Sequence, residues 1–140
     1  MKKIVLISCV SKKRSVKSKA RDLYISPLFK KNLQYASKLQ PDRIFILSAK
    51  YGLVSLDEEI DPYDLTLNTM PAKEVKEWSE RVLHDLAVQA DFQQDHFIFL
   101  AGAKYRKYLV GHLIHVEVPF EGLTIGRQLQ RLTEQGNTNG

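Results

Sequence analysis

The segment DPYDLT, residues 61–66, carries the side chains best suited to acid–base chemistry. Pro62 restricts one backbone angle and removes one hydrogen-bond donor, so it holds its neighbours in place. Asp64, or alternatively Asp61, could activate water or stabilise a cationic sugar, which is the task of carboxylates in glycosidic-bond cleavage. The competing interpretation is structural, with Asp64 and Thr66 capping turns in a packed loop. We favour the catalytic interpretation, with Asp64 ahead of Asp61.

A second polar group, Ser48, Lys50 and Tyr51, follows the apolar run of residues 44–47. Lys50 could bind a phosphate or a carbonyl group, and we include it among the catalytic candidates. Tyr51 could act as a stacking platform for a base, and Ser48 could hydrogen-bond the base or the sugar. Alternatively, Tyr51 packs beneath the following loop and Lys50 is simply solvated.

Six basic residues lie in one segment, from Lys12 to Arg21, interleaved with small serines. These cations could bind phosphates, and Ser26 at the start of the next helix could add amide donors. The alternative is a solvated loop that only aids solubility. Basic residues and tyrosines alternate again at 104–108, which suits either a nucleic-acid surface or an ordinary helix over the core. The phosphate-binding candidates are Lys12, Lys19, Arg21 and Lys104.

Cys9 is the only cysteine, so neither an intramolecular disulfide nor a cysteine-based zinc site can form. Beside the basic segment its thiolate could act as a nucleophile, although a small buried residue is the favoured interpretation. The four histidines show no metal-binding spacing. Neither a GxxxxGKS/T nor a GxGxxG loop occurs, which argues against a nucleotide triphosphatase or a dinucleotide enzyme. The chemistry above therefore requires no metal and no cofactor.

Hydrophobic periodicity predicts the elements that position these residues. Strands are expected at residues 3–9, 44–48, 96–100 and 113–118, and helices at 27–39, 71–90, 104–109 and 123–134. Their alternation predicts an α/β fold, with a mainly parallel four-stranded sheet and helices on both faces. Ligands bind outside the carboxyl ends of parallel strands, so the candidate segments are predicted to meet at one edge of the sheet.

The length of 140 residues predicts a single domain over residues 1–134, followed by a disordered tail at 135–140. No apolar run approaches the roughly 20 residues that a membrane span needs. We therefore expect a cytoplasmic protein with no membrane partner. The net charge of +5 is compatible with a polyanionic partner but does not require one.

Three separated motifs resemble a family of short, largely uncharacterised bacterial and phage domains. They are RDLYISPLF at residues 21–29, LSAKYGL at 47–53 and PYDLT at 62–66. The closing segments PFEGL and IGRQL, at 119–123 and 125–129, fit the ending of that family. The resemblance spans nearly the whole chain and implies no defined activity.

Two looser resemblances point toward nucleobases. The spacing from Cys9 to Lys12, with Tyr24 and Ser26 downstream, is similar to the catalytic-domain motif of archaeosine synthases, which modify a deazaguanine base in transfer RNA. That resemblance implies a uracil-DNA-glycosylase-like fold, but the proline, lysine and histidine pattern needed for amidation is missing. LS and YGL at 47–53, with the following PY, are similar to the peroxide-stress YaaA family, which binds DNA. Chains of that family are longer and commonly have Arg in place of Asp64.

We therefore expect an enzyme that acts on a nucleobase within nucleic acid, DNA more than RNA, by N-glycosidic cleavage or base modification. Asp64, Asp61 and Lys50 are the catalytic candidates, and the base would be extruded from the helix to reach them. The expected substrate-binding residues are Cys9, Lys12, Lys19, Arg21, Tyr24, Ser26, Ser48, Tyr51, Tyr63, Thr66 and Lys104. The alternatives are a non-catalytic nucleic-acid-binding module of a stress or phage-defence system and an enzyme on free nucleosides or nucleotides.

Overall fold

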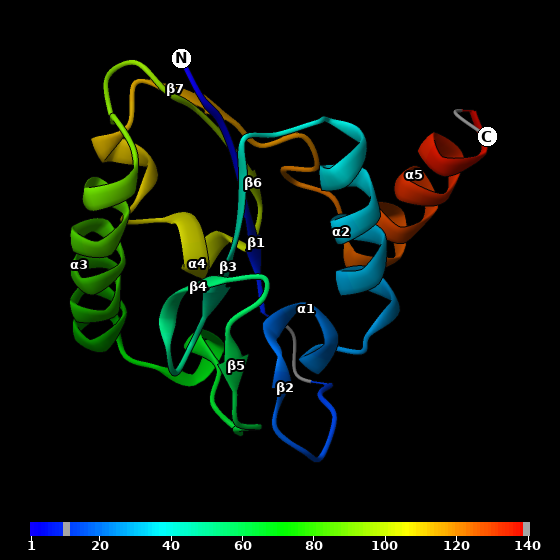
Figure 1. The fold of residues 1–140 in the computed structure, drawn as a ribbon, viewed down its shortest axis with the longest axis horizontal. Helices are drawn as coiled ribbons and strands as arrows, with labels where there is room; N and C mark the ends of the chain where they lie inside the picture. Colours follow the sequence, from blue (N-terminus) through cyan, green and yellow to red (C-terminus); the bar gives the residue numbers. More distant parts are fainter. Residues whose placement is uncertain (10–11, 139–140) are drawn as a thin grey trace.

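The protein is an α/β domain built on a five-stranded sheet, seen here in a computed structural model that describes residues 1–9 and 12–138 (Figure 1). The strand order is β4-β3-β1-β6-β7. The four strands other than β4 run parallel, as the sequence predicts, and β4 is antiparallel to β3. The strands are β1 (Lys3–Ser8), β3 (Arg43–Ser48), β4 (Gly52–Ser55), β6 (His96–Leu100) and β7 (His115–Glu117).

The predicted number of four strands is wrong, because β4 lies where the sequence indicates a loop. Gly52 has a φ of 75°, a value that glycine adopts without strain, and it turns the chain back along β3. The returning segment pairs Gly52 with Ser48 and Val54 with Ile46. Burial of Gly52 and Val54 alternates with half-exposed neighbours, but four residues are too few for this alternation to stand out in the sequence.

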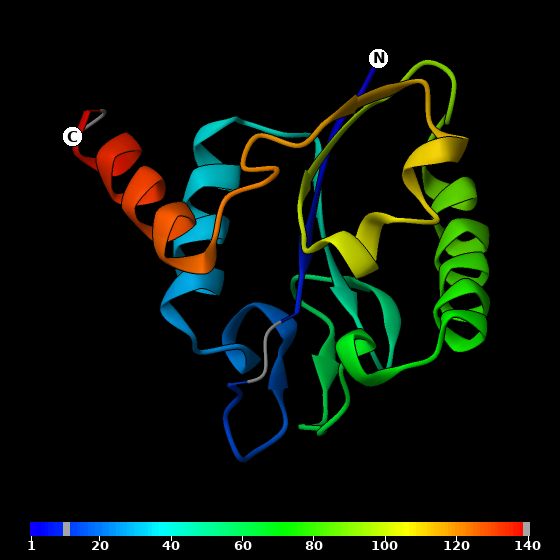
Figure 2. The ribbon, with the colours of Figure 1, turned by 180° about the vertical axis from the view of Figure 1, so that it is seen from behind.

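Helices cover both faces of the sheet, with α2 and α5 on one side and α3 on the other (Figures 1 and 2). The helices are α1 (Ala20–Leu23), α2 (Pro27–Lys38), α3 (Ala72–Gln89), α4 (Ala103–Arg106) and α5 (Ile125–Thr138). The predicted start of α2 is confirmed, since the Ser26 side chain accepts a hydrogen bond from the Phe29 N–H. Helix α5 continues past Glu134 to Thr138, through part of the predicted disordered tail. Residues 139 and 140 of that tail lie outside the described residues.

Two long loops are joined by a second, two-stranded sheet beyond the carboxyl end of β1 (Figure 1). Strand β2 (Ser18–Lys19) pairs antiparallel with β5 (Glu59–Ile60). Two short 3₁₀ helices, η1 (Leu67–Thr69) and η2 (Val110–His112), follow β5 and α4. The sequence predicts only loops here, because elements of two or three residues carry no measurable periodicity. This small sheet brings the basic segment next to the acidic one.

The core is centred on β1, which has a parallel neighbour on each side. Ile4, Val5, Leu6 and Ile7 are all fully buried, as expected for a strand covered on both faces. Trp78 of α3 is also buried and donates its indole N–H to the carbonyl oxygen of Ser48 at 2.8 Å. This bond fixes α3 against the carboxyl end of β3. In the described part of the chain, no helix is long and apolar enough to cross a membrane.

Candidate functional site at the carboxyl edge of the sheet

Three hydroxyl groups meet where β3 ends, and we call Tyr24, Ser48 and Tyr63 the hydroxyl cluster. Ser48 is fully buried and donates to the Tyr63 hydroxyl at 2.8 Å. The hydroxyls of Tyr63 and Tyr24 lie 2.7 Å apart, within hydrogen-bond distance. The backbone N–H of Tyr51 donates to Ser48 Oγ at 3.0 Å. The cluster therefore ties residue 63 of the DPYDLT segment to the end of the central sheet.

Lys13 covers the hydroxyl cluster from the basic segment. Its Nζ lies 4.4 Å from the centroid of the Tyr63 ring and 5.7 Å from that of Tyr24. Burial lowers the pKa of Lys13, while the charges of Cys9 and Asp64 oppose this shift. Burial also raises the pKa of Tyr24 to about 12 and raises the pKa of Tyr63. Both phenols therefore remain protonated and neutral at physiological pH.

A second polar group lies at the end of β1. The Cys9 thiol donates to the Tyr105 hydroxyl at 3.2 Å, and the backbone N–H of Leu67 donates to the same oxygen at 3.3 Å. Thr66 Oγ1 lies 3.4 Å from that hydroxyl. Burial raises the pKa of Tyr105, so this phenol is also neutral. Tyr105 thus connects β1, the helix after β6 and the end of the DPYDLT segment.

A cavity of about 350 Å³ opens beside Tyr105, and we call it the edge cavity. Cys9, Thr66 and Tyr105 contribute polar atoms to its wall, and Leu28 and Leu100 contribute apolar ones. Its volume falls in the range of about 300–1,000 Å³ that is typical of small-molecule sites. The sheet topology predicts a ligand site at this edge, and the edge cavity lies there.

Asn32 of α2 also lines the edge cavity. It is only 5% exposed, and its side-chain oxygen Oδ1 has no hydrogen-bond partner. An unsatisfied buried polar group costs about 1–3 kcal/mol, and such groups are rare in folded proteins. Asn32 is not among the predicted site residues. Its sequence signal is helical spacing, since it lies three positions after the buried Phe29 and four before the buried Ala36.

Comparison with known proteins adds a family and no activity. A family model described as a family of unknown function, DUF6884, matches residues 4–134. The chain belongs to this family. That result confirms the predicted membership in an uncharacterised domain family. No curated protein and no solved structure matches the chain, so the function of this DUF6884 chain must be argued from its own residues.

The two candidate carboxylates of the DUF6884 chain are exposed. Burial lowers the pKa of Lys13 and the negative charge of Asp64 opposes this lowering, so this carboxylate lies within electrostatic reach of Lys13 above the hydroxyl cluster. Leu65 and Thr66, which follow it directly, line the edge cavity. Asp64 therefore lies next in the chain to the wall of the cavity, whereas Asp61 lies next to the small sheet, directly after β5.

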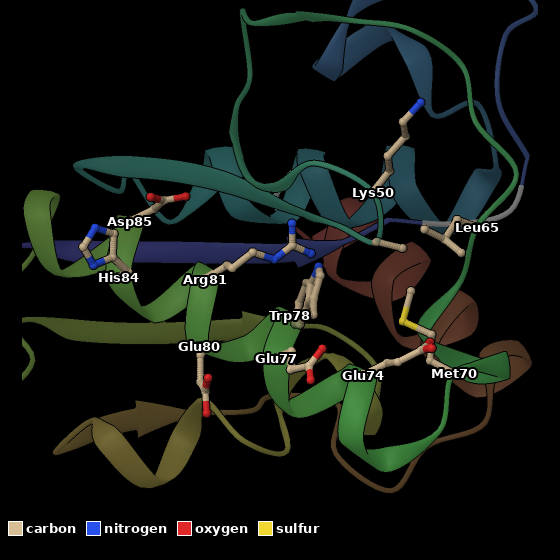
Figure 3. Close-up of a pocket in the computed structure, with 11 residues that line it drawn as sticks. Lys50, Leu65, Met70, Glu74, Glu77, Trp78, Glu80, Arg81, His84 and Asp85 are labelled. Atoms are coloured by element: carbon tan, nitrogen blue, oxygen red, sulfur yellow. The ribbon is translucent and has the colours of Figure 1, made fainter.

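Lys50, the third catalytic candidate, is not among the residues that line the edge cavity. It lines a separate open groove of about 850 Å³ between α3 and the segment that follows β3. Figure 3 shows its side chain directed away from α3, and its Nζ lies 5.3 Å from the centroid of the Tyr51 ring. Leu65 lines both hollows and separates them. Four acidic side chains of α3, Glu74, Glu77, Glu80 and Asp85, also line this groove, which makes it a poor site for phosphates.

Several predicted substrate-binding residues are hydrogen-bonded inside the protein. Ser48 and Tyr24 are 0% and 1% exposed and their hydroxyls lie within hydrogen-bond distance of Tyr63, so their role as substrate-binding residues stays a prediction. Both hydroxyls help to position Tyr63. The Tyr63 ring is half-buried, with Tyr51 edge-on at 5.7 Å and the Lys13 amine over its face. Tyr51 itself is half-exposed, which leaves part of its surface open.

The predicted phosphate-binding residues divide into paired and more open ones. Arg21 Nε lies 3.1 Å from the carboxylate of Asp57, and Lys19 stands opposite Glu59 in the small sheet. The Lys104 amine donates to the backbone oxygen of Asn68 at 3.0 Å, and Ser26 caps α2. Lys12 is exposed. The acidic segment thus offsets part of the basic charge, a pairing that only the tertiary structure reveals.

Lys13 and Tyr105 were also missing from the predicted site residues. Lys13 has the same sequence character as the other cations of its segment, and only its position over Tyr63 distinguishes it. Tyr105 lies in the segment 104–108, where basic residues and tyrosines alternate. Its contact with Cys9 spans 96 positions and therefore has no local sequence signal. Among the described residues, no group of three or more His, Cys, Asp or Glu side chains is arranged to hold a metal ion.

Proposed function

We propose that this protein is an enzyme that acts on a nucleobase in nucleic acid and cleaves the N-glycosidic bond. The observation that carries the proposal is the edge cavity, where the buried Asn32 and Cys9 and the hydroxyl-bearing Ser8, Thr66 and Tyr105 line one hollow at the carboxyl ends of β1 and β6. Its volume of about 350 Å³ suits a single base. A base inside a duplex cannot reach such a cavity, so it would be extruded from the helix.

Asp64 would be the catalytic carboxylate. In the proposed step, it orients a water molecule, and the water oxygen bonds to the sugar carbon C1′ as the bond from C1′ to the base nitrogen breaks. The electron pair of that bond leaves with the base, which takes up a proton, while the water loses one. Negative charge at Asp64 would also stabilise the positive charge that develops on the sugar. The hydroxyl cluster supports this role because it holds the preceding residue, Tyr63, in place.

The rim of the cavity would meet the nucleic-acid backbone. Lys12 and Lys17 are exposed in the basic segment, which begins a few residues after Cys9 on the cavity wall. Cations at this position would bind phosphates and make affinity depend on salt. DNA is the first substrate to test, and a uracil-DNA-glycosylase-like arrangement of the sheet forms part of this proposal.

The same exposed cations favour a second candidate, a non-catalytic nucleic-acid-binding module. In that case the negative charge of Asp64 has no chemical task, and neutralising it would leave the biological effect intact. Reversing the charge at Lys12 and Lys17 would abolish that effect. The two candidates therefore make opposite predictions for Asp64.

The deciding experiment is a product assay. The purified protein is incubated with single- and double-stranded DNA carrying normal and modified bases, and released base is measured by mass spectrometry. We expect release that falls at least a hundredfold in Asp64→Asn, because general acid–base groups contribute about 10²–10⁴-fold. Asp85→Asn, an exposed carboxylate of the α3 groove, is the matched control and should retain full activity. Tight, salt-dependent binding without release would replace the enzyme by the binding module.

A further inference from the structure

We infer that Asn32 is the residue by which the edge cavity selects its ligand, and that the selected group is the edge of a planar ring bearing an N–H donor. The inference deepens the proposed function and takes from it the choice of a nucleobase as that ring. It adds a specificity-determining residue and a chemical criterion for the substrate.

The side-chain oxygen of Asn32 indicates the group that is selected. The residue lies in the middle of α2, on its buried face with Phe29 and Ala36, and is 5% exposed. Nearby hydroxyls already have partners within the protein, including that of Tyr105. The Asn32 Oδ1 has none. Asn32 lines the cavity, and its buried acceptor has no partner in the protein, so a ligand that supplies the missing donor would be complementary to this side chain.

The side-chain amide also limits the geometry of that ligand. Asparagine presents an acceptor oxygen and a donor NH₂ group side by side in one plane. This pair matches a base edge on which an N–H group adjoins an acceptor, as in the pairing of Asn with adenine. Adenine, cytosine, guanine and uracil each have at least one such edge. Replacing the donor hydrogens with methyl groups destroys the match without removing the ring.

The remaining walls suit the flat faces of a ring. Leu28 of α2, Leu100 at the end of β6 and Ile125 of α5 line the cavity together with Asn32. Ile125 is 64% exposed, so it lies at the open side, where the sugar would leave the cavity. Asn68 and Gln128 also line the cavity, but Asn32 is the buried amide among the three, and apolar walls beside a buried amide give orientation to a ring that has one polar edge.

Binding of free bases tests the inference independently of catalysis. The unmodified bases are supplied with only the glycosidic nitrogen blocked, as 9-methyladenine, 1-methylcytosine and 1-methyluracil, and are titrated by ligand-observed NMR. Each is compared with an analogue that has no N–H donor left: N6,N6,9-trimethyladenine, N4,N4,1-trimethylcytosine and 1,3-dimethyluracil. We expect at least one unmodified base to bind and its analogue to bind about tenfold or more weakly, the effect of losing one hydrogen bond to a buried group. Asn32→Leu should weaken binding of the unmodified base by a similar factor. Gln34→Leu, an exposed amide on the same helix, should leave binding unchanged.

Three outcomes overturn the inference: none of the bases binds, methylation makes no difference, or Asn32→Leu binds as the natural protein does. The last would mean that Asn32 holds only water. The melting temperature of each variant is measured alongside, so that loss of fold is not mistaken for loss of a contact. If base binding depends on Asn32 but the product assay detects no released base, the glycosylase proposal is wrong and the role of Asn32 in the edge cavity is supported. If base is released but no binding depends on Asn32, the glycosylase proposal is supported and the role of Asn32 is wrong.

Discussion

The two edges of the central sheet differ in how completely their buried polar groups are hydrogen-bonded. At the amino edge, the Asp95 carboxylate accepts hydrogen bonds from the backbone N–H groups of Lys2 and Asp91, both at 2.8 Å. Asp42 accepts from the N–H of Lys3 at 2.7 Å. At the carboxyl edge, a cavity is open and the Oδ1 of Asn32 is unpaired. Closed hydrogen bonding stabilises the fold at the amino edge, whereas the unpaired buried acceptor at the carboxyl edge is the basis of the proposed ligand site.

The largest effect on stability is expected at the amino edge, for Asp95→Ala. Asp95 is 5% exposed, and its removal would leave the N–H groups of Lys2 and Asp91 without their acceptor. We expect a loss of about 2–3 kcal/mol in the free energy of unfolding, measured by urea denaturation. Base binding should be unchanged in the folded variant. A loss of binding without a loss of stability would contradict the division between the two edges.

The next largest effect is expected in the dependence of stability on pH, at acidic pH, and it arises from Asp95. Burial alone would raise the pKa of Asp95, but hydrogen bonds from the N–H groups of Asp91 and Lys2 produce a net lowering from the ordinary value of 3.8. A lowered folded-state pKa means that the stabilisation is fully present above pH 3.8 and is lost as the pH falls through the lower, folded value. We expect the stability difference between the natural protein and Asp95→Asn to narrow over that window. Denaturation curves collected from pH 7 downward measure it.

A smaller loss is expected for Tyr63→Phe at the carboxyl edge. The variant keeps the ring and removes the hydroxyl that lies within hydrogen-bond distance of Tyr24 and Ser48. Loss of the hydroxyl should cost about 1–2 kcal/mol of stability and lower base release through misplacement of Asp64. Tyr51→Phe, which retains its edge-on contact with Tyr63, is the control. Equal effects of the two variants on stability would show that the cluster does not hold the segment.

Substitution of Asn32, unlike the substitutions above, is not expected to lower the free energy of unfolding. Leucine has the same number and branching of side-chain heavy atoms, favours helices, and removes the unpaired Oδ1, and the adjoining edge cavity leaves room for its larger methyl groups, so Asn32→Leu should leave stability unchanged or raise it by up to about 1 kcal/mol. Chemical denaturation measures this change. A clear destabilisation would mean that Asn32 has a structural partner, such as a tightly bound water, and would weaken the contrast between the edges.

The smallest effects are expected in the basic segment. Arg21→Ala should change stability by less than about 0.5 kcal/mol, since exposed ion pairs contribute little. If the segment binds phosphates, Lys12→Ala should reduce the slope of log affinity against log salt by about 0.9. Arg21→Ala should reduce it less, because Asp57 already neutralises Arg21. Equal slopes for the two variants would remove this distinction.

Local patterns in the sequence were enough for the main architecture. The buried strand β1, the capped start of α2 and the bounds of β6 follow from runs of apolar residues and from the Ser-Pro pair at 26–27. These features depend on neighbours within one turn or one strand. The parallel arrangement and the edge at which ligands bind then follow from the alternation of strands and helices.

Which side chains meet at that edge was decided by the tertiary structure. Cys9 meets Tyr105 across 96 positions, and Tyr24 meets Tyr63 across 39. Such contacts depend on strand order and on the small β2-β5 sheet, neither of which has a local signature. The same pairing placed Arg21 beside Asp57. The sequence therefore predicted the edge of the sheet at which a candidate site lies, and only the folded chain determined that Asn32 lines the edge cavity there while Lys50 lies in another groove.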